Sequence, residues 1–408
     1  MGRTLSKLWE RTMKKFLMAS AASALVAGTA YAGGHGEVKI GVILGFTGPI
    51  EALTPAMADG AEFAMAEVSS SGAFLGGKTV APVRADSTCI DAAAATAAAE
   101  RLITSDGVSG IMGADCSGVT GAILANVALA NGMVMISPSA TSPGLSTAED
   151  NGLFFRTAPS DARQGVVMAE SLMEMGSTEV ALTYVNNDYG KGLASSFEEA
   201  FKSMGGTITI SAAHEDEKAD YSAEVAALAA AGGDRLVVAG YNTGGGAGII
   251  RASLDSGAFD MFHLPDGMIG GSLETDFGSE IDGTTGQAPG TDSPGASQLV
   301  DLIGDAFDGS SVFVAESYDA AALIMLAMQA AGSDNPADYK GKVMDVANAP
   351  GEKIYPGELA KGLEILANGG DIDYVGASAV ELIGPGESSG SYRQIVFEGG
   401  KMTTVKYR

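Results

Sequence analysis

The 408-residue sequence has few basic residues, only three histidines and only two cysteines. Lys and Arg together number 24, against 50 Asp and Glu, which gives a formal net charge of −26. A field of this sign repels nucleic-acid phosphates and anionic lipids, so the composition excludes nucleic acid as a partner. His35, His214 and His263 stand far apart and share no ligand spacing with the cysteines. We therefore expect no metal site, no cofactor and no catalytic constellation.

Long hydrophobic runs are absent beyond residue 32, where no stretch reaches the ~18 apolar residues that a membrane-spanning helix needs. The N-terminus carries the basic Met13-Lys14-Lys15, an apolar and small-residue stretch over 16–28, and then Ala30-Tyr31-Ala32. This order is typical of a cleavable secretory signal peptide, and the apolar stretch is too short to cross a membrane. We expect residues 1–32 to be removed by cleavage after Ala32, with Met13 as an alternative start. The mature chain is expected to be exported and soluble.

The two cysteines are Cys89 and Cys116. An even number of cysteines in an exported chain favours a disulfide, because the compartment outside the cytoplasm is oxidising. Closing the loop between them would stabilise the fold by roughly 3 kcal/mol in the chain-entropy model.

Short β-rich apolar runs alternate with helical patterns along most of the chain. Before residue 160 the sequence predicts strands at 37–45, 79–85, 108–113, 134–136 and 154–157, and helices at 56–68, 92–103 and 118–130. The pattern then restarts, with strands at 179–185, 207–211, 235–239 and 261–264 and helices at 163–175, 193–204, 221–231 and 248–256. This alternation predicts the α/β class, with two doubly wound parallel sheets.

The last third of the chain is less regular. Residues 279–297 are rich in Gly, Thr and Pro and are expected to form a loop or crossover. Helices are expected near 298–307, 317–331 and 358–368, and strands near 375–382, 392–398 and 403–407. The last two strands, joined by Gly399-Gly400, should pair as a hairpin.

Three short strings match catalytic or nucleotide-binding motifs but stand in the wrong context. Residues 72–79 fit the P-loop string, yet a predicted helix precedes them and a strand follows, the reverse of what phosphate binding needs. Residues 386–390 place Ser388 in a nucleophile string, but no histidine follows it, and we expect a solvated turn. The glycine-rich 244–248 lacks dinucleotide spacing and is expected to be a tight turn at a helix start.

Polar and aromatic side chains cluster where predicted strands end and helices begin. These junctions hold Gly48-Pro49, Asp115-Cys116-Ser117, Ser139-Ala140-Thr141, Asp188-Tyr189-Gly190, Tyr241-Asn242 and Asp266-Gly267. Ligands of open α/β sheets bind at the carboxyl ends of the strands. Hydroxyls and helix N-termini suit a carboxylate, an aspartate suits an ammonium, and tyrosines supply a partly apolar wall. The junctions therefore predict a cleft for a small zwitterion.

The sequence resembles type I periplasmic solute-binding proteins of the leucine/isoleucine/valine-binding family. The resemblance is carried by 39–49 (KIGVILGFTGP), the regions of Cys89 and Cys116, 135–143, Phe155-Arg156-Thr157 with Asp161 and Gln164-Gly165, and Asp188-Tyr189-Gly190. It implies two lobes joined by a hinge that the chain crosses three times, with the Cys89–Cys116 disulfide. The lobes would be residues 33–159 with 289–390, and residues 160–288 with 391–408.

The resemblance also implies ligand-binding residues within the cleft. Ser117 and Thr141 would bind an α-carboxylate, and the carbonyl of Ser139 with the hydroxyl of Thr141 would help to hold an α-ammonium, Ala140 lying between them. Tyr189 and Tyr241 would cover the ligand from the second lobe. Asp266 stands where the family carries a glutamate for the ammonium.

Two positions near the cleft depart from the family pattern and leave the ligand side chain open. Leu53 replaces an aromatic residue, and Glu316 adds an acid near the cleft. The sequence thus predicts a monomeric, non-enzymatic periplasmic receptor that delivers an amino acid to the membrane permease of an ABC importer. Alternatives are a binder of a short amide, urea or carboxylic acid, a ligand-sensing module of a membrane receptor, or a hydrolase using Ser388.

Overall fold

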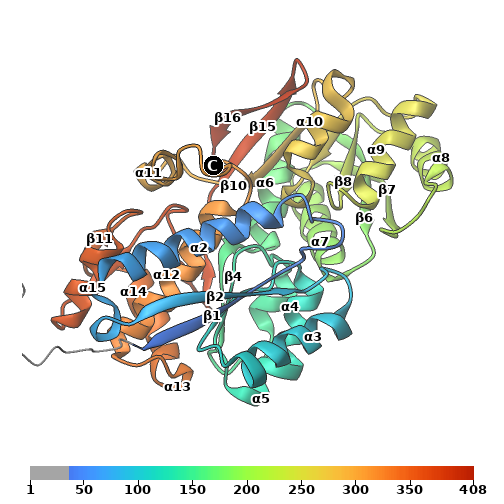
Figure 1. The fold of residues 1–408 in the computed structure, drawn as a ribbon. Coiled ribbons are helices and arrows are strands. Elements are labelled where there is room, and N and C mark those ends of the chain that lie inside the picture. The colour runs from blue at the N-terminus through green and yellow to red at the C-terminus, as the bar shows by residue number, and fades with distance from the viewer. Residues whose placement is uncertain (1–35) are drawn as a thin grey trace, which may run out of the picture. The chain divides into compact units, whose positions relative to one another are not determined.

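Two seven-stranded sheets organise the chain in the computed structural model, which describes residues 36–408 (Figure 1). The expected signal peptide and its cleavage after Ala32 lie outside the described residues. Most neighbouring strands in both sheets are parallel. The α/β class with two mostly parallel sheets, predicted from the alternating pattern, is confirmed.

The first sheet has the strand order β13-β14-β5-β4-β3-β1-β2, and we call the elements around it lobe 1. Its strands are β1 (Glu37–Leu44), β2 (Thr79–Asp86), β3 (Ile111–Gly113), β4 (Met135–Ser137), β5 (Phe154–Pro159), β13 (Leu382–Ile383) and β14 (Glu387–Ser388). The helices that connect the early strands are α2 (Thr54–Ser71), α3 (Ala92–Arg101), α4 (Ser117–Ile123) and α5 (Leu129–Asn131). β1 and β3 to β5 are almost wholly buried, as expected for strands covered on both faces.

The second sheet has the order β16-β15-β10-β9-β8-β6-β7, and its surrounding elements form lobe 2. Its strands are β6 (Glu179–Val185), β7 (Thr207–His214), β8 (Arg235–Ala239), β9 (Phe262–Leu264), β10 (Thr285–Pro289), β15 (Tyr392–Glu398) and β16 (Lys401–Tyr407). Its helices are α6 (Asp161–Glu174), α7 (Asp188–Ser203), α8 (Ser222–Ala231), α9 (Gly245–Ser256) and α10 (Gly271–Phe277). β15 and β16 pair antiparallel, which confirms the predicted hairpin.

The chain passes between the two sheets at three places: after β5, after β10 and between β14 and β15. At the first passage, the amide of Asp161 donates to the carbonyl of Thr141 over 2.8 Å. The second and third passages lie side by side. The amide of Gly290 donates to the carbonyl of Ser391, and the hydroxyl of Ser391 donates to the carbonyl of Gly290. Within residues 36–408, these three segments are the covalent links between the strands of the two sheets.

After the second passage the chain returns to lobe 1 and adds further elements. They are α11 (Pro294–Ile303), α12 (Val314–Ala331), α13 (Pro336–Tyr339), α14 (Val343–Ala347), α15 (Leu359–Ala367) and the strand pair β11 (Glu352–Ile354) and β12 (Ile372–Tyr374). α12 is buried along almost its whole length and packs on α2, α14 and α15. A helix that is apolar all round belongs inside a core, and α12 anchors the returning chain to lobe 1.

One prediction for the last third of the chain is right in part and another is wrong. Residues 279–297, expected to form a loop or crossover, contain the second passage between the sheets, but they also contain β10 and the start of α11. β10 reads Thr-Gly-Gln-Ala-Pro, which has poor β-propensity, and it forms because β9 and β15 flank it. Residues 375–382, expected to be a strand, form turns because the amides of Ala377 and Ser378 donate to the buried carboxylate of Asp319. The short helices α13 and α14 were not predicted.

The structure also places the three misleading strings. Residues 72–79 run from the end of α2 to the start of β2, so helix precedes strand as expected and no P-loop forms. The glycine-rich string opens α9, which confirms a tight turn at a helix start. Ser388 is 4% exposed on the two-residue strand β14, so the expectation of a solvated turn is wrong. β14 pairs with both β5 and β13, and this pairing buries the serine.

Candidate functional site

A narrow cavity lies between the strand ends of lobe 1 and lobe 2. It is lined by Ile50, Leu53, Asp115, Cys116, Ser117, Ser139, Tyr189, Tyr241, Asp266, Gly267 and Phe313. Five of the seven residues predicted to bind ligand are among them, and the other two, Ala140 and Thr141, are buried outside the lining. The space open to solvent is about 20 Å³, which is room for one or two waters.

The lobe 1 wall is built on the N-terminus of α4. Cys116 is the N-cap residue, and Ser117 is the first helical residue. The hydroxyl oxygen of Ser117 accepts from the amide of Ser142 over 3.0 Å, so its own proton stays available to a ligand. The helix N-terminus adds unpaired amides and a partial positive charge, which favour a carboxylate at this end of the cavity.

The segment Ser139-Ala140-Thr141 lies beside Ser117, and hydrogen bonds to neighbouring residues hold it in place. The hydroxyl of Ser139 donates to the carbonyl of Asp115 over 3.1 Å. The hydroxyl of Thr141 is buried and has no partner among residues 36–408, so it remains free to bond a ligand that approaches it. Ala140 is fully buried, and its carbonyl accepts from Arg156 over 3.0 Å.

Arg156 on β5 positions this segment, a role that was not predicted from the sequence. Its side chain is 1% exposed, and Nη1 donates to the carbonyls of Ala140 and Ser142. Nη2 lies 2.5 Å from Glu387 on β14, where it forms a salt bridge. The sequence resembles the family at Phe155-Arg156-Thr157, which draws attention to Arg156. The resemblance does not show which groups Arg156 bonds.

The lobe 2 wall centres on Asp266, which follows β9 directly. Oδ1 accepts from the hydroxyl of Tyr189 over 2.8 Å and from the amide of Gly267 over 2.7 Å. Oδ2 is buried without a partner among the described residues. Asp266 therefore shapes the turn with one oxygen and leaves the other open, in a carboxylate only 1% exposed.

The electrostatics of this wall favour a cation. Burial raises the pKa of Asp266, because the charged form loses its hydration. Asp161, also buried, has its pKa raised well above the usual range by burial and then by the neighbouring charge of Asp266. Neither oxygen of Asp161 has a hydrogen-bond partner within residues 36–408. A ligand ammonium at Asp266 would supply the positive charge that the protein itself does not place there.

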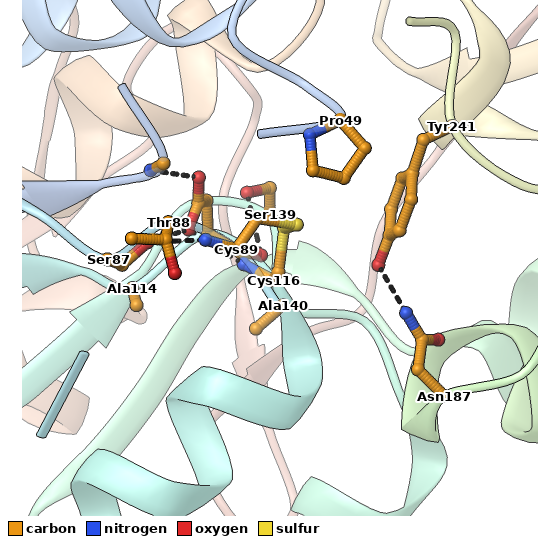
Figure 2. Close-up of a disulfide and its surroundings, with 12 residues drawn as sticks. Pro49, Ser87, Thr88, Cys89, Ala114, Cys116, Ser139, Ala140, Asn187 and Tyr241 are labelled. Atoms are coloured by element: carbon orange, nitrogen blue, oxygen red, sulfur yellow. Dashed lines mark hydrogen bonds between the residues drawn. A yellow bond between two sulfur atoms is a disulfide. The ribbon is translucent and has the colours of Figure 1, made fainter. Parts of the chain in front are cut away.

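Two tyrosines close the lobe 2 side. The rings of Tyr189 and Tyr241 stack with centroids 5.3 Å apart. The amide of Asn187 donates to the hydroxyl of Tyr241 over 3.1 Å, and Figure 2 shows this bond on the side of the tyrosine ring away from Pro49. Each tyrosine is thus fixed by a hydrogen bond at its hydroxyl, and the pair forms a rigid wall.

The remaining lining is apolar and comes from lobe 1. Ile50 and Leu53 precede α2, and Phe313 is the N-cap residue of α12. Phe313 has φ of 67°, a left-handed conformation that is strained for a bulky residue and is found disproportionately at functional sites. The sequence did not single out Phe313, because no local pattern signals a positive φ in a phenylalanine.

The disulfide between Cys89 and Cys116 is present and confirms the predicted pair (Figure 2). It joins the loop after β2 to the start of α4, with the two Cα atoms 5.1 Å apart. Beside it, the buried carboxylate of Asp115 accepts from the amide of Gly45 and the hydroxyl of Ser87. The bridge and this carboxylate together fix the lobe 1 wall.

We expect the double variant Cys89→Ser/Cys116→Ser to lose about 3 kcal/mol of unfolding free energy, because the unfolded chain regains the entropy of an open loop. Urea unfolding of both proteins measures the difference. Reductant should lower the stability of the wild type and leave the variant unchanged. Two titratable thiols in wild-type protein purified without reductant would contradict the account.

A side-chain hydrogen bond between the two lobes lies near the cavity. The hydroxyl of Thr243, between β8 and α9, donates to the carbonyl of Pro49 over 2.6 Å. The amide of Thr243 approaches the same carbonyl at 3.4 Å. The contact joins the loop after β1 to the loop after β8, so it can form only while the lobes are together.

We expect Thr243→Val to weaken ligand affinity about fivefold, because one hydrogen bond of about 1 kcal/mol is lost from the closed form. Titration calorimetry measures the change. Thr275→Val is the matched control, since its hydroxyl bonds only the carbonyl of Gly271 within α10. An unchanged affinity for Thr243→Val, or an equal loss for both variants, would show that the contact does not hold the lobes closed.

The two histidines within the described range are core residues. His214 bonds Thr183, and His263 bonds Thr285, each through Nδ1. Burial lowers the pKa of His214 to about 4 and that of His263 to about 3, so both are neutral at pH 7.

Within residues 36–408, no group of three or more His, Cys, Asp or Glu side chains is arranged to hold a metal ion. Nor is any helix in that range long and apolar enough to cross a membrane.

Comparison with known proteins places this arrangement in context. A family model described as periplasmic binding protein matches residues 37–348. The Leu/Ile/Val/Thr-binding protein of Salmonella typhimurium is 30% identical over 336 residues, covering 80% of this chain and 90% of that protein.

Solved structures share the fold at lower identity. The branched-chain amino acid transporter substrate binding protein LivJ from Streptococcus pneumoniae, in complex with isoleucine, has a TM-score of 0.76 at 23% identity, covering 91% of this chain and 99% of that one. A solute binding protein of an ABC transporter from R. palustris, in complex with benzoate, has a TM-score of 0.73 at 20% identity, covering 91% and 96%.

Proposed function

The chain belongs to the family of periplasmic binding proteins, and from that premise we propose that it binds an amino acid in the cavity between its lobes. The family expected from the sequence is thereby confirmed. We further propose that the chain is exported by cleavage after Ala32 and works as a monomer that delivers its ligand to the membrane permease of an ABC importer. The relative from S. typhimurium is named for binding Leu, Ile, Val and Thr, which supports an amino acid ligand.

The observation that carries the proposal is the free Oδ2 of Asp266, buried opposite a helix N-terminus. A ligand ammonium at Oδ2 would pair a buried charge that otherwise has no partner. The α-carboxylate would lie across the cavity at the hydroxyl of Ser117 and the N-terminus of α4, with Thr141 as a second donor. A zwitterion would pair with Asp266 through its ammonium and with the N-terminus of α4 through its carboxylate. A simple amine or a simple acid would pair with only one of them.

The ligand side chain would lie against Ile50, Leu53 and Phe313, whose surfaces are apolar. An aliphatic side chain gains burial there at about 25 cal/mol per Å². Leu53 leaves more room than an aromatic residue would, so this wall favours branched or longer aliphatic side chains over glycine.

The cavity must widen before a ligand enters, because its solvent space of about 20 Å³ holds no more than one or two waters. We propose that the three chain passages act as the hinge for this movement. The moving bodies would be residues 33–159 with 289–390, and residues 160–288 with 391–408. Binding would then favour the closed form, since ligand groups contact both walls only when the lobes meet.

The second candidate is a binder of a short carboxylic acid, an amide or urea. It is favoured by the benzoate complex of a protein with the same fold. Such a ligand would satisfy Ser117 and Thr141 but would leave Asp266 without a cation. A ligand-sensing module of a membrane receptor would use the same cavity, so the ligand test applies to it equally.

A thermal-shift screen distinguishes the ligand classes, because a solute that binds only the folded protein raises its unfolding temperature. The panel contains the aliphatic amino acids, short amides, urea and short carboxylic acids, each at the same ionic strength. We expect aliphatic amino acids to give the largest shifts. A larger shift with an acid or an amide than with any amino acid would replace the proposal by the second candidate.

A further inference from the structure

A second and larger pocket lies where the second and third chain passages meet the start of α12. We call it the crossing pocket, and its volume is about 390 Å³. The residues that line it include Asp292, Ser311, Phe313, Glu316, Ser378 and Arg393. They come from the segment after β10, the N-terminal region of α12, the loop after β12 and the strand β15. Figure 1 labels β10, α12 and β15.

Glu316 places a buried carboxylate in the crossing pocket. Its side chain is 3% exposed, and no other residue within 36–408 forms a hydrogen bond or salt bridge with its carboxylate. Asp319, one turn further along α12, is buried to the same degree, but its carboxylate accepts from Tyr374, Ala377 and Ser378. The contrast matters because a structural buried acid is normally satisfied by neighbouring donors, as Asp319 is.

Arg393 lines the same pocket and carries a donor that has no partner among the described residues. Nη2 donates to the carbonyl of Ser310 over 3.1 Å, while Nε is buried without a partner among the described residues. The charged residues that line the pocket are Asp292, Asp301, Glu316 and Arg393, so acids outnumber the single cation. The pocket thus offers an unpaired acceptor and an unpaired donor within an acidic lining, which suits a cationic solute with a second polar group.

Phe313 separates the crossing pocket from the cleft, since its side chain lines both. Asp266, Tyr189 and Tyr241 line only the cleft. The backbone carbonyl of Glu316 accepts from the hydroxyl of Thr157 over 2.8 Å, which fixes the start of α12 against β5. The two cavities therefore present different charged groups behind a shared wall.

We propose that the crossing pocket is a second binding site, separate from the cleft, for a small solute that carries an ammonium group. The ammonium pairs with Glu316, and a hydroxyl or carboxylate on the same solute accepts from Arg393. An occupant would touch the second passage and β15 at once and so bridge the two lobes beside their connecting segments. The proposal does not depend on which solute binds in the cleft.

The pH dependence of binding follows from the groups that face Glu316. Burial raises its pKa to about 7, Asp319 and Asp266 raise it in addition, and Arg393 lowers it. Glu316 is mostly protonated at pH 6 and mostly ionised at pH 8, whereas a simple amine stays protonated at both. Binding through an ion pair should therefore be roughly tenfold tighter at pH 8 than at pH 6.

The test is titration calorimetry of the full chain with ethanolamine at pH 8, using potassium chloride at equal ionic strength as the blank. We expect ethanolamine to bind the wild type and Asp266→Asn alike, and to bind Glu316→Gln at least tenfold more weakly. Glu364→Gln, which removes an exposed charge on α15, is the matched control and should bind as the wild type does. Glu316→Gln keeps the volume and removes a buried charge, so its unfolding temperature at pH 8 should not fall below that of the wild type.

An absence of ethanolamine binding to the wild type would overturn the proposal. So would binding that is lost in Asp266→Asn and kept in Glu316→Gln, because the amine would then occupy the cleft. An absence of pH dependence would show that Glu316 is not the partner. Amino acid binding in the cleft is tested separately, by the ligand screen and by titration of Asp266→Asn with an amino acid, so the two proposals can fail independently.

Discussion

Asp266→Asn is expected to weaken amino acid binding by roughly 2–5 kcal/mol, because the ligand ammonium would be buried without its counter-charge. The substitution is well suited to separate two roles of the residue. Asparagine retains an oxygen that can accept from Tyr189 and Gly267, as Oδ1 does in the structure. It removes the charge and replaces the free Oδ2 by a donor, which opposes an ammonium. Titration calorimetry with the strongest amino acid of the screen measures the loss.

Stability gives the control within the same experiment. Removing a buried carboxylate whose pKa is raised by burial should not lower the unfolding free energy of the unliganded protein near pH 7. Asp260→Asn, an exposed aspartate before β9, should leave both affinity and stability unchanged. Equal affinities for wild type and Asp266→Asn would reduce Asp266 to a turn-forming residue.

Arg156→Met is expected to lower the free energy of unfolding by about 3–5 kcal/mol, because the buried groups that pair with the guanidinium would be left without a partner. Glu387 would lose its cation, and the carbonyls of Ala140 and Ser142 would lose their donor. Methionine fills much of the volume, so the loss measures the polar network more than a cavity. Urea unfolding measures this loss, with both proteins fitted to the same dependence of unfolding free energy on urea concentration.

The same substitution at an exposed arginine provides the comparison. Arg84 pairs with Asp59 and Glu62 but is 42% exposed, so Arg84→Met should cost less than about 1 kcal/mol. Arg156→Met should also weaken ligand binding, because the Ser139-Ala140-Thr141 segment loses its support. A stability loss at Arg156 no larger than that at Arg84 would mean that the segment is held by something else.

The sequence predicted the architecture well where local pattern and burial agree. Strands such as β1 and β8 are continuous apolar runs, and the helices between them are regular, so alternation alone implied two α/β units. The prediction failed at β10, where a strand forms from residues of poor β-propensity between two existing strands. It failed again at residues 375–382, which are drawn into turns by the carboxylate of Asp319. Both failures are tertiary contacts that override local preference.

The site was partly predictable for a similar reason. Ser117, Tyr189 and Asp266 lie within four residues of a strand end, and parallel strands bring such ends to one edge of a sheet. Phe313 could not be found in this way, because its place in the cavity depends on a left-handed backbone before α12. The role of Arg156 was equally hidden, since its partners lie on other segments, 10 to 231 residues away in the sequence.

Recognition of both charged groups of an amino acid by the cleft can be tested by paired titrations of the wild type. The strongest amino acid of the screen is compared with the carboxylic acid that lacks only its amino group and with the amine that lacks only its carboxylate. The account predicts that each analogue binds at least a hundredfold more weakly than the amino acid, since each leaves Asp266 or the N-terminus of α4 without its partner. Binding of the deaminated acid as tightly as the amino acid would contradict it.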